Sequence, residues 1–479
     1  MIELIALALV VALFGSFLNL RAGIYACLIV GFLQDPLRKL IPNEPIYVTA
    51  LVVVFAFVTF VGGRLQHVML PFNSIPDWST RLKSAVLAFF ALVVFQCLAS
   101  YVYTGSLILA GIGFMAYLSP FPALQMSYSF ARRMDRIQTF LWLYLGINAL
   151  MSAGVYLSLL DLDWAVLRSV GENMVVYSWD VGAIILPAGF YRVPELAAWH
   201  AASGACIALA LGMANRRQTI AGLSVALALF FFGAVLLTGR RKFLIEIAIY
   251  LPFFLYFAYR FKLGGARFLG AIVVATLIGV GLSASSIATD DTISSFRESN
   301  VRGQARGETI VEEALARLAL MTVDTLPYVV EENGILGSGA GSGSQGAQYF
   351  GGGSDRVGLS AEGGLGKVLA ELGIPGLLIV LWLVFKILAY VWQTLTIVAR
   401  GDTYVARLTM GLASFLAANS IVFITAHQAF GDLFVLLLLG FILGFVFAIR
   451  RLVVTGDDPR PLRTAIASSP ASAYSPEHA

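Results

Sequence analysis

Three consecutive cations, Arg240, Arg241 and Lys242, interrupt a long apolar stretch in LLTGRRKFLIEIAIY. A charged side chain at the centre of a membrane span costs roughly 2.5–3.5 kcal/mol of insertion free energy, so such residues need a physical reason. Guanidinium groups can hold phosphate oxygens through parallel hydrogen bonds, and an ammonium adds a point charge. The cations could instead anchor the chain among lipid headgroups. The choice depends on which side of the membrane they face.

A second group of ionisable residues lies where a polar segment meets an apolar run, in SAEGGLGKVLAELGIPGLLIVLWLVFKIL. A helix that begins near Leu365 would present its N-terminal amide groups to an anion, with Lys367 in its first turn. Glu362 lies just before this helix. It could act as a general base towards a hydroxyl group, or it could only cap the helix.

The composition indicates the class of protein that must position these residues. Of 479 residues, 59% are hydrophobic and 13% are charged, and the mean hydropathy is +0.83. Apolar runs recur along the chain, many of them long enough to cross a hydrocarbon core of about 30 Å as a helix. We therefore expect an all-α, polytopic integral membrane protein of about 12–14 transmembrane helices with a large extracytoplasmic loop.

Residues 1–450 are expected to form one polytopic membrane domain, and residues 451–479, rich in Pro, Ser and Ala, a disordered cytoplasmic tail. The second apolar run is short and the fifth contains Pro120 and Pro122, so each of these is expected to be interfacial or broken. The expected spans are 3–19, 22–34, 46–63, 84–103, 105–130, 137–159, 197–214, 219–237, 243–259, 267–287, 368–395, 404–425 and 431–449.

The basic residues predict the orientation of these spans. If the first span is uncleaved and its N-terminus lies outside, nearly every Lys and Arg cluster between spans faces the cytoplasm, as the positive-inside rule requires. The long loops 160–196 and 288–367 then lie outside, together with Arg240, Arg241 and Lys242. Because these three cations break the rule, the sequence favours a site for an anionic ligand over headgroup anchoring.

The second outer loop contains a candidate amphipathic helix around residues 311–321 and a glycine- and serine-rich run at 333–356. The helix could form a lid or contact a ligand, and the run could be a mobile lid or a linker. GSGSQG and GGLGKV lack the context of a dinucleotide or Walker motif. The modest net charge of +4, spread over short clusters, excludes an extended nucleic-acid surface. The three cysteines fall in apolar runs, which predicts neither disulfides nor a thiolate metal site.

Four segments between residues 186 and 385 resemble motifs of the O-antigen ligase and O-antigen polymerase superfamily of bacterial membrane glycosyltransferases. They are GFYRVPELAAWHAA, LLTGRRKFL, LARLALMTVDTLPYVVEENGILGSGAGSGS and AEGGLGKVLAELGIPGLL. The first is similar to G-x-F-x-x-P-N-x-x-A, with Glu195 in place of the asparagine. The second is similar to T-G-S-R, with Arg241 on its arginine and Arg240 on its serine. The fourth aligns Glu371 with the glutamate of the family pattern, and Glu362 with its presumed catalytic histidine.

The resemblance implies a metal-independent, cofactor-free polysaccharide polymerase in the bacterial inner membrane, with its active site facing the periplasm or exterior. It would transfer undecaprenyl-diphosphate-linked oligosaccharide to a glycan or lipid acceptor, among membrane lipids and with a chain-length regulator or other assembly proteins as partners. Glu362 would be the catalytic base and Arg240, Arg241 and Arg192 would bind the diphosphate. Secondary candidates are Lys367, Glu371, Arg356, Arg306 and His427.

Three other functions remain open. An O-antigen ligase that transfers finished glycan to lipid A core or another acceptor would use the same residues. A transporter of an anionic lipid or glycan would need a polar path across the spans, for which Glu246 and Glu371 are the main embedded charges. A membrane scaffold would leave the outer loops unexplained.

Overall fold

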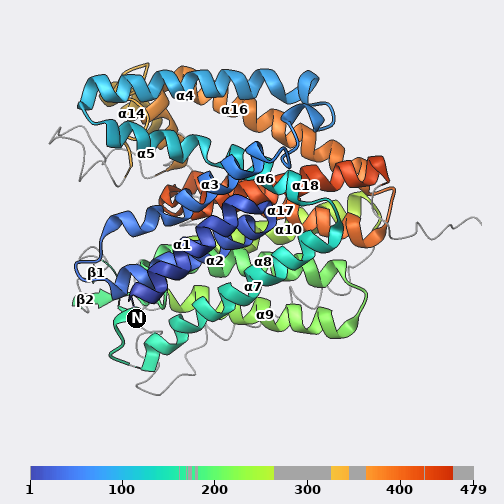
Figure 1. Ribbon diagram of the computed structural model, residues 1–479, viewed down its shortest axis with the longest axis horizontal. Coiled ribbons are helices and arrows are strands. Elements are labelled where there is room, and N and C mark those ends of the chain that lie inside the picture. The colour runs from blue at the N-terminus through green and yellow to red at the C-terminus, as the bar shows by residue number, and fades with distance from the viewer. Residues whose placement is uncertain are drawn as a thin grey trace, which may run out of the picture.

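The computed structural model describes residues 2–160, 162–168, 170, 175–178, 182–263, 325–344, 363–425 and 427–456. Helices run side by side along the molecule and are joined mostly by short turns (Figure 1). They are α1 (Ile2–Leu18), α2 (Leu20–Leu40), α3 (Leu51–Leu65), α4 (Lys83–Thr104), α5 (Leu107–Leu118), α6 (Pro120–Phe130), α7 (Met134–Leu157), α8 (Pro194–Ala214), α9 (Gln218–Leu237), α10 (Leu244–Arg260), α14 (Thr325–Asn333), α16 (Gly364–Val398), α17 (Thr403–Thr425) and α18 (Leu433–Thr455).

The expected helical architecture is confirmed for the described residues, and the helices are compatible with a multi-pass membrane protein. Within the described residues, 10 helical segments are long and apolar enough to cross a membrane, and α1 contains a shorter apolar stretch, Leu7–Leu18. The chain also forms α10, which has 17 residues. The expected span at 267–287 lies outside the described residues.

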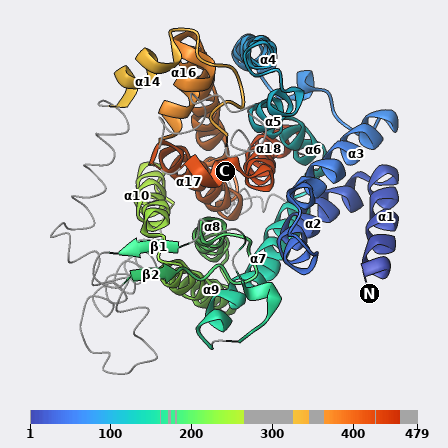
Figure 2. The same ribbon diagram turned by 90° about the vertical axis from the view of Figure 1, so that its left-hand side faces the viewer.

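Helix α8 forms the centre of the bundle. Figure 2 shows α7, α9, α10 and α17 around it, and every residue of α8 except Glu195 is buried. Its sequence, PELAAWHAASGACIALALGMA, is apolar on all sides and rich in Ala and Gly, which lets neighbouring helices approach closely. At Gly204 an added Cβ would lie 2.9 Å from the Phe231 ring of α9. The small residues therefore set the packing distance around α8.

The second and fifth apolar runs, which were expected to be interfacial or broken, differ in structure. The fifth run is broken as expected, because α5 ends at Leu118 and α6 restarts with Pro120 at its first position. The second run is longer than expected, since α2 continues through Asp35 and Lys39 to Leu40. Lys39 Nζ donates to the carbonyl oxygens of Val166 at 3.0 Å and Gly189 at 2.7 Å. These contacts provide hydrogen-bond acceptors for the Lys39 ammonium group, which the sequence alone places in a loop.

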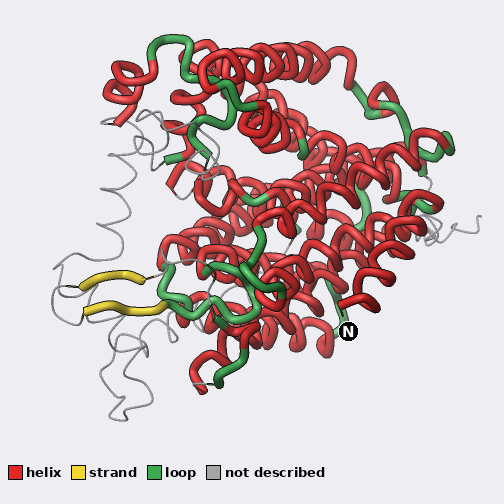
Figure 3. Tube along the Cα trace, turned by 60° about the vertical axis from the view of Figure 1, so that its left-hand side comes forward, coloured by secondary structure: helices red, strands yellow, loops and turns green. Residues whose placement is uncertain are grey.

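The loops also hold structure that was not expected. Within 160–196, β1 (Val175–Ser178) and β2 (Gly182–Ile185) form an antiparallel hairpin that projects from the helices (Figure 3). Helix α18 continues past residue 450 to Thr455, into the stretch that was expected to be a tail. Helix α16 begins at Gly364, one residue from the start expected near Leu365. The candidate helix at 311–321 and residues 457–479 lie outside the described residues.

Candidate functional site

Several of the expected site residues meet at one end of the bundle, which faces the viewer in Figure 2. Arg192 precedes α8, and Arg240 follows α9 directly before the one-turn helix η7 (Arg241–Phe243). His427 opens η10 (His427–Gly431), which follows α17. Both η7 and η10 contact α8 and α17. The antiparallel succession of helices therefore brings together turns that are far apart in the sequence.

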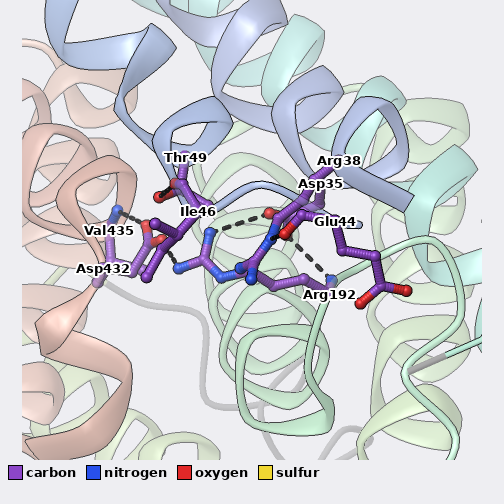
Figure 4. Close-up of polar contacts among 8 residues, drawn as sticks. All are labelled: Asp35, Arg38, Glu44, Ile46, Thr49, Arg192, Asp432 and Val435. Carbon is purple, nitrogen blue, oxygen red and sulfur yellow. Dashed lines mark hydrogen bonds and ion pairs between the residues drawn. The ribbon is translucent and has the colours of Figure 1, made fainter. Parts of the chain in front are cut away.

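Arg192 lies between two carboxylates (Figure 4). Its Nη1 is 3.0 Å from Asp35 Oδ1, its backbone N–H donates to Asp35 Oδ2 at 3.2 Å, and its Nη2 pairs with Asp432 Oδ2. The side chains of Arg192, Asp35 and Asp432 are 15%, 6% and 5% exposed. Asp432 also caps α18 by accepting the N–H of Val435 at 3.0 Å. This guanidinium joins α2, the start of α8 and the start of α18.

The charge balance around Arg192 favours its ionised form. Burial by itself lowers the pKa of the guanidinium, but the carboxylates of Asp432 and Asp35 outweigh burial and raise the pKa above its ordinary value. Both arms of the guanidinium are already engaged. A phosphate group could bind Arg192 only by displacing a carboxylate.

The turn between α9 and α10 presents the three central cations. Gly239 adopts a left-handed conformation, with φ of +67°, which glycine tolerates without strain. Arg240 Nη2 then pairs with Glu195 Oε1, in the first turn of α8, at 2.7 Å. Lys242 Nζ donates to Gln428 Oε1 of η10 at 2.5 Å. Arg241 begins η7, and its side chain lies outside the described part of the chain.

Glu371 fixes the first half of the glycine-rich run against α16. Its Oε1 accepts the N–H of Gly343 at 3.0 Å, and its backbone carbonyl accepts the N–H of Gly339 at 3.1 Å. The N–H groups of Ser338, Ala340, Ser342 and Ser344 also donate to backbone carbonyl oxygens. Donors that are engaged in this way cannot also hold phosphate. The described half of the run is thus a packed segment.

Lys367 lies in the first turn of α16, as expected, and is 8% exposed. Among the described residues, no hydrogen bond or ion pair engages its ammonium group. Gly364 starts this helix against α17, where an added Cβ would lie 2.6 Å from the Phe423 ring. Lys367 is therefore a buried cation near the junction of α16 and α17. The remaining expected residues, Glu362, Arg306 and Arg356, lie outside the described residues.

Some polar partners were not predicted from the sequence. Asp432 directly precedes an apolar run, which is a helix N-cap signal that could have been noticed, whereas no local signal marks Asp35. Deeper in the bundle, Glu246 Oε1 accepts from Ser203 Oγ at 2.9 Å and from Asn419 Nδ2 at 3.0 Å. Its second oxygen is buried and has no hydrogen-bond partner in the described part of the chain.

In the described ranges, no group of three or more His, Cys, Asp or Glu residues is placed to hold a metal ion. What the arrangement offers chemically is a set of cations at one end of an apolar bundle, with carboxylates interleaved among them. Compared with known proteins, the chain matches no family model and no curated protein.

Proposed function

We propose that this protein is a membrane glycosyltransferase that polymerises polyprenyl-diphosphate-linked oligosaccharides at the outer face of a bacterial inner membrane. The observation that carries the proposal is the packing of the Arg240–Lys242 turn against α8 and η10 at one end of an apolar helical bundle. A lipid diphosphate needs both features, because its tail requires apolar surroundings and its charge requires fixed cations. The likeness of four sequence segments to the O-antigen polymerase and ligase superfamily supports the same proposal.

The proposed reaction transfers the donor's reducing-end sugar. The acceptor hydroxyl oxygen bonds to the anomeric carbon, the bond from that carbon to the diphosphate breaks, and Glu362 takes the hydroxyl proton. The lipid diphosphate leaves with the bonding electrons. Arg241 is its principal ligand through a bidentate guanidinium, followed by Arg240, because charge develops on the departing oxygen. Arg192 acts indirectly, by holding the start of α8.

A ligase would run the same chemistry on a different acceptor and remains the nearest alternative. A transporter of an anionic lipid or glycan is the alternative from another class. The buried carboxylate of Glu246 favours it, because ionisable groups inside membrane bundles often line transport paths. Against it, the span of α8 beside Glu246 is fully buried by neighbouring helices.

The experiment that tests the proposal compares glycan products in cells whose only copy of the protein is wild type, Arg241→Ala or Glu362→Gln. Both variants should abolish most polymer while single lipid-linked repeat units accumulate on the outer face, because donor supply continues and transfer stops. A matched control is Arg168→Ala, which removes an exposed cation paired with Asp163. A wild-type glycan profile in both normally expressed variants would refute the proposal, and loss of outer-face repeat units would favour transport.

A further inference from the structure

Arg240 already holds an anion from within the molecule. Its Nη2 is 2.7 Å from Glu195 Oε1, and the two side chains are 22% and 16% exposed. The partners come from different elements, the turn after α9 and the first turn of α8. The carboxylate of Glu195 therefore occupies one anion position at the end of the bundle where the cations gather.

This ion pair is incomplete. Arg240 Nε and Glu195 Oε2 are both buried, and neither has a hydrogen-bond partner among the described residues. A carboxylate and a guanidinium can form two parallel hydrogen bonds, but this geometry provides one. Arg192 differs, since it engages two carboxylates through both arms and its backbone N–H. The Arg192 cluster has the features of a permanent structural contact, whereas the Arg240–Glu195 pair leaves a donor and an acceptor unused.

We propose that Glu195 occupies the anion position at Arg240 while no donor is bound, and that the donor's diphosphate displaces it. This inference rests on the proposed function. A diphosphate carries several oxygens and more than one negative charge, so it can engage both Nε and Nη2 and outcompete a single carboxylate. The headgroup of an ordinary phospholipid carries one phosphate and competes less well. Glu195 is thus a specificity-determining residue that keeps abundant monophosphate lipids away from Arg240.

A simpler role predicts different behaviour. Glu195 lies in the first turn of α8, where a carboxylate interacts favourably with the helix dipole. If that were its only role, replacing it would change stability and leave anion affinity unaltered. Competition instead predicts that removing the carboxylate charge raises the affinity of the site for anions.

The test measures binding of inorganic pyrophosphate and inorganic phosphate to the purified full-length protein in detergent by titration calorimetry. Glu195→Gln should bind pyrophosphate about tenfold more tightly than wild type, and its preference for pyrophosphate over phosphate should fall. Arg240→Ala should bind weakly, and adding Glu195→Gln to it should restore nothing. Asp163→Asn is the matched control, because it removes the carboxylate of an exposed ion pair in the loop before α8. Each variant is first checked by thermal unfolding, and Glu195→Asp, which should give a smaller gain, replaces a Glu195→Gln protein that does not fold.

Unchanged or weaker pyrophosphate binding in Glu195→Gln would overturn the inference, as would an equal gain in Asp163→Asn. If no form of the protein binds pyrophosphate while cells still make polymer in an Arg241-dependent manner, the inference fails and the proposed function stands. Pyrophosphate affinity could rise only in Glu195→Gln while the Arg241→Ala and Glu362→Gln variants still make normal glycan. That combination would support competition by Glu195 and refute the proposed glycosyltransferase function.

Discussion

At Arg192, one guanidinium neutralises two carboxylates from helices that are distant in sequence. Asp35 ends the apolar part of α2 and Asp432 caps α18. Removing one partner of a buried ion pair leaves an uncompensated charge, which typically destabilises a protein by about 3–5 kcal/mol. Arg192 removal would leave two such charges facing each other. The cluster therefore connects three parts of the bundle through a single residue.

We expect Arg192→Ala to lower the melting temperature strongly, through the loss of about 3–5 kcal/mol of stability. Arg192→Lys should recover only part of this stability, because an ammonium cannot reproduce the two arms that reach Asp35 and Asp432. Thermal unfolding in detergent, followed by tryptophan fluorescence, measures the melting temperatures of both variants. Arg168→Ala, at an exposed ion pair, should leave the melting temperature unchanged. An Arg192→Ala protein that melts like wild type but no longer binds pyrophosphate would show that Arg192 is a ligand contact.

Helix α16 has a kink at Gly373, and the glycine-rich segment packs against it there. Gly373 has φ of +68° and ψ of −172° inside the helix. There the N–H of Ile374 donates to Ile335 O at 2.9 Å, and Gln96 of α4 donates to Leu336 O at 2.8 Å. The kink thus opens the helix backbone so that the glycine-rich segment can pair with it.

Replacing Gly373 by Ala should therefore be strongly destabilising. The positive φ disfavours any L side chain, and the new Cβ would lie 2.7 Å from Leu336 Cα. We expect a lower melting temperature and faster protease cleavage within residues 334–344. Gly146→Ala in α7 is the matched control, because nothing lies within 4 Å of its added Cβ, and it should be neutral or stabilise by up to about 1 kcal/mol. Equal effects of the two substitutions would show that the kink does not require glycine.

Local sequence signals predicted several elements well. Pro120 marked the break between α5 and α6, and the start of α16 was placed one residue from Gly364. The continuation of α2 through Asp35 and Lys39 was missed, because their charges resemble a loop. Their partners, Arg192 and the carbonyl oxygens of Val166 and Gly189, are more than a hundred residues away and give no local signal.

The candidate site was predicted only in part, for the same reason. Arg240 and Glu195 each depart from the motifs that their segments resemble, but only the fold shows that they pair with each other. Residues 334–344 have a composition typical of a mobile segment. Their order comes from the backbone of α16 and the side chains of Gln96 and Glu371, which composition cannot reveal.

At the scale of the bundle, the basic residues in the described part of the chain are distributed unequally between its two ends. The end opposite the candidate site contains most of the described turns that carry them, because consecutive spans run antiparallel. These turns contain Arg21, Arg64, Arg81, Lys83, Arg132, Arg133, Arg216, Arg217, Arg400 and Arg451. Short loops rich in Lys and Arg stay in the cytoplasm during insertion. This distribution predicts that the candidate site faces the exterior.

The orientation can be tested by labelling single cysteines in intact, outer-membrane-permeabilised cells, after Cys27, Cys97 and Cys206 have been replaced. The Asp163→Cys thiol, at a side chain that is 85% exposed in the loop before α8, should react with a membrane-impermeant maleimide. The Gly401→Cys thiol, in the turn between α16 and α17, should react only after the inner membrane is opened with detergent. A denatured sample provides the control that each thiol is present and reactive. Because the glycosyltransferase proposal needs the Arg240–Lys242 turn on the same side as its lipid-linked donor, the reverse labelling pattern would refute the orientation and the proposed function together.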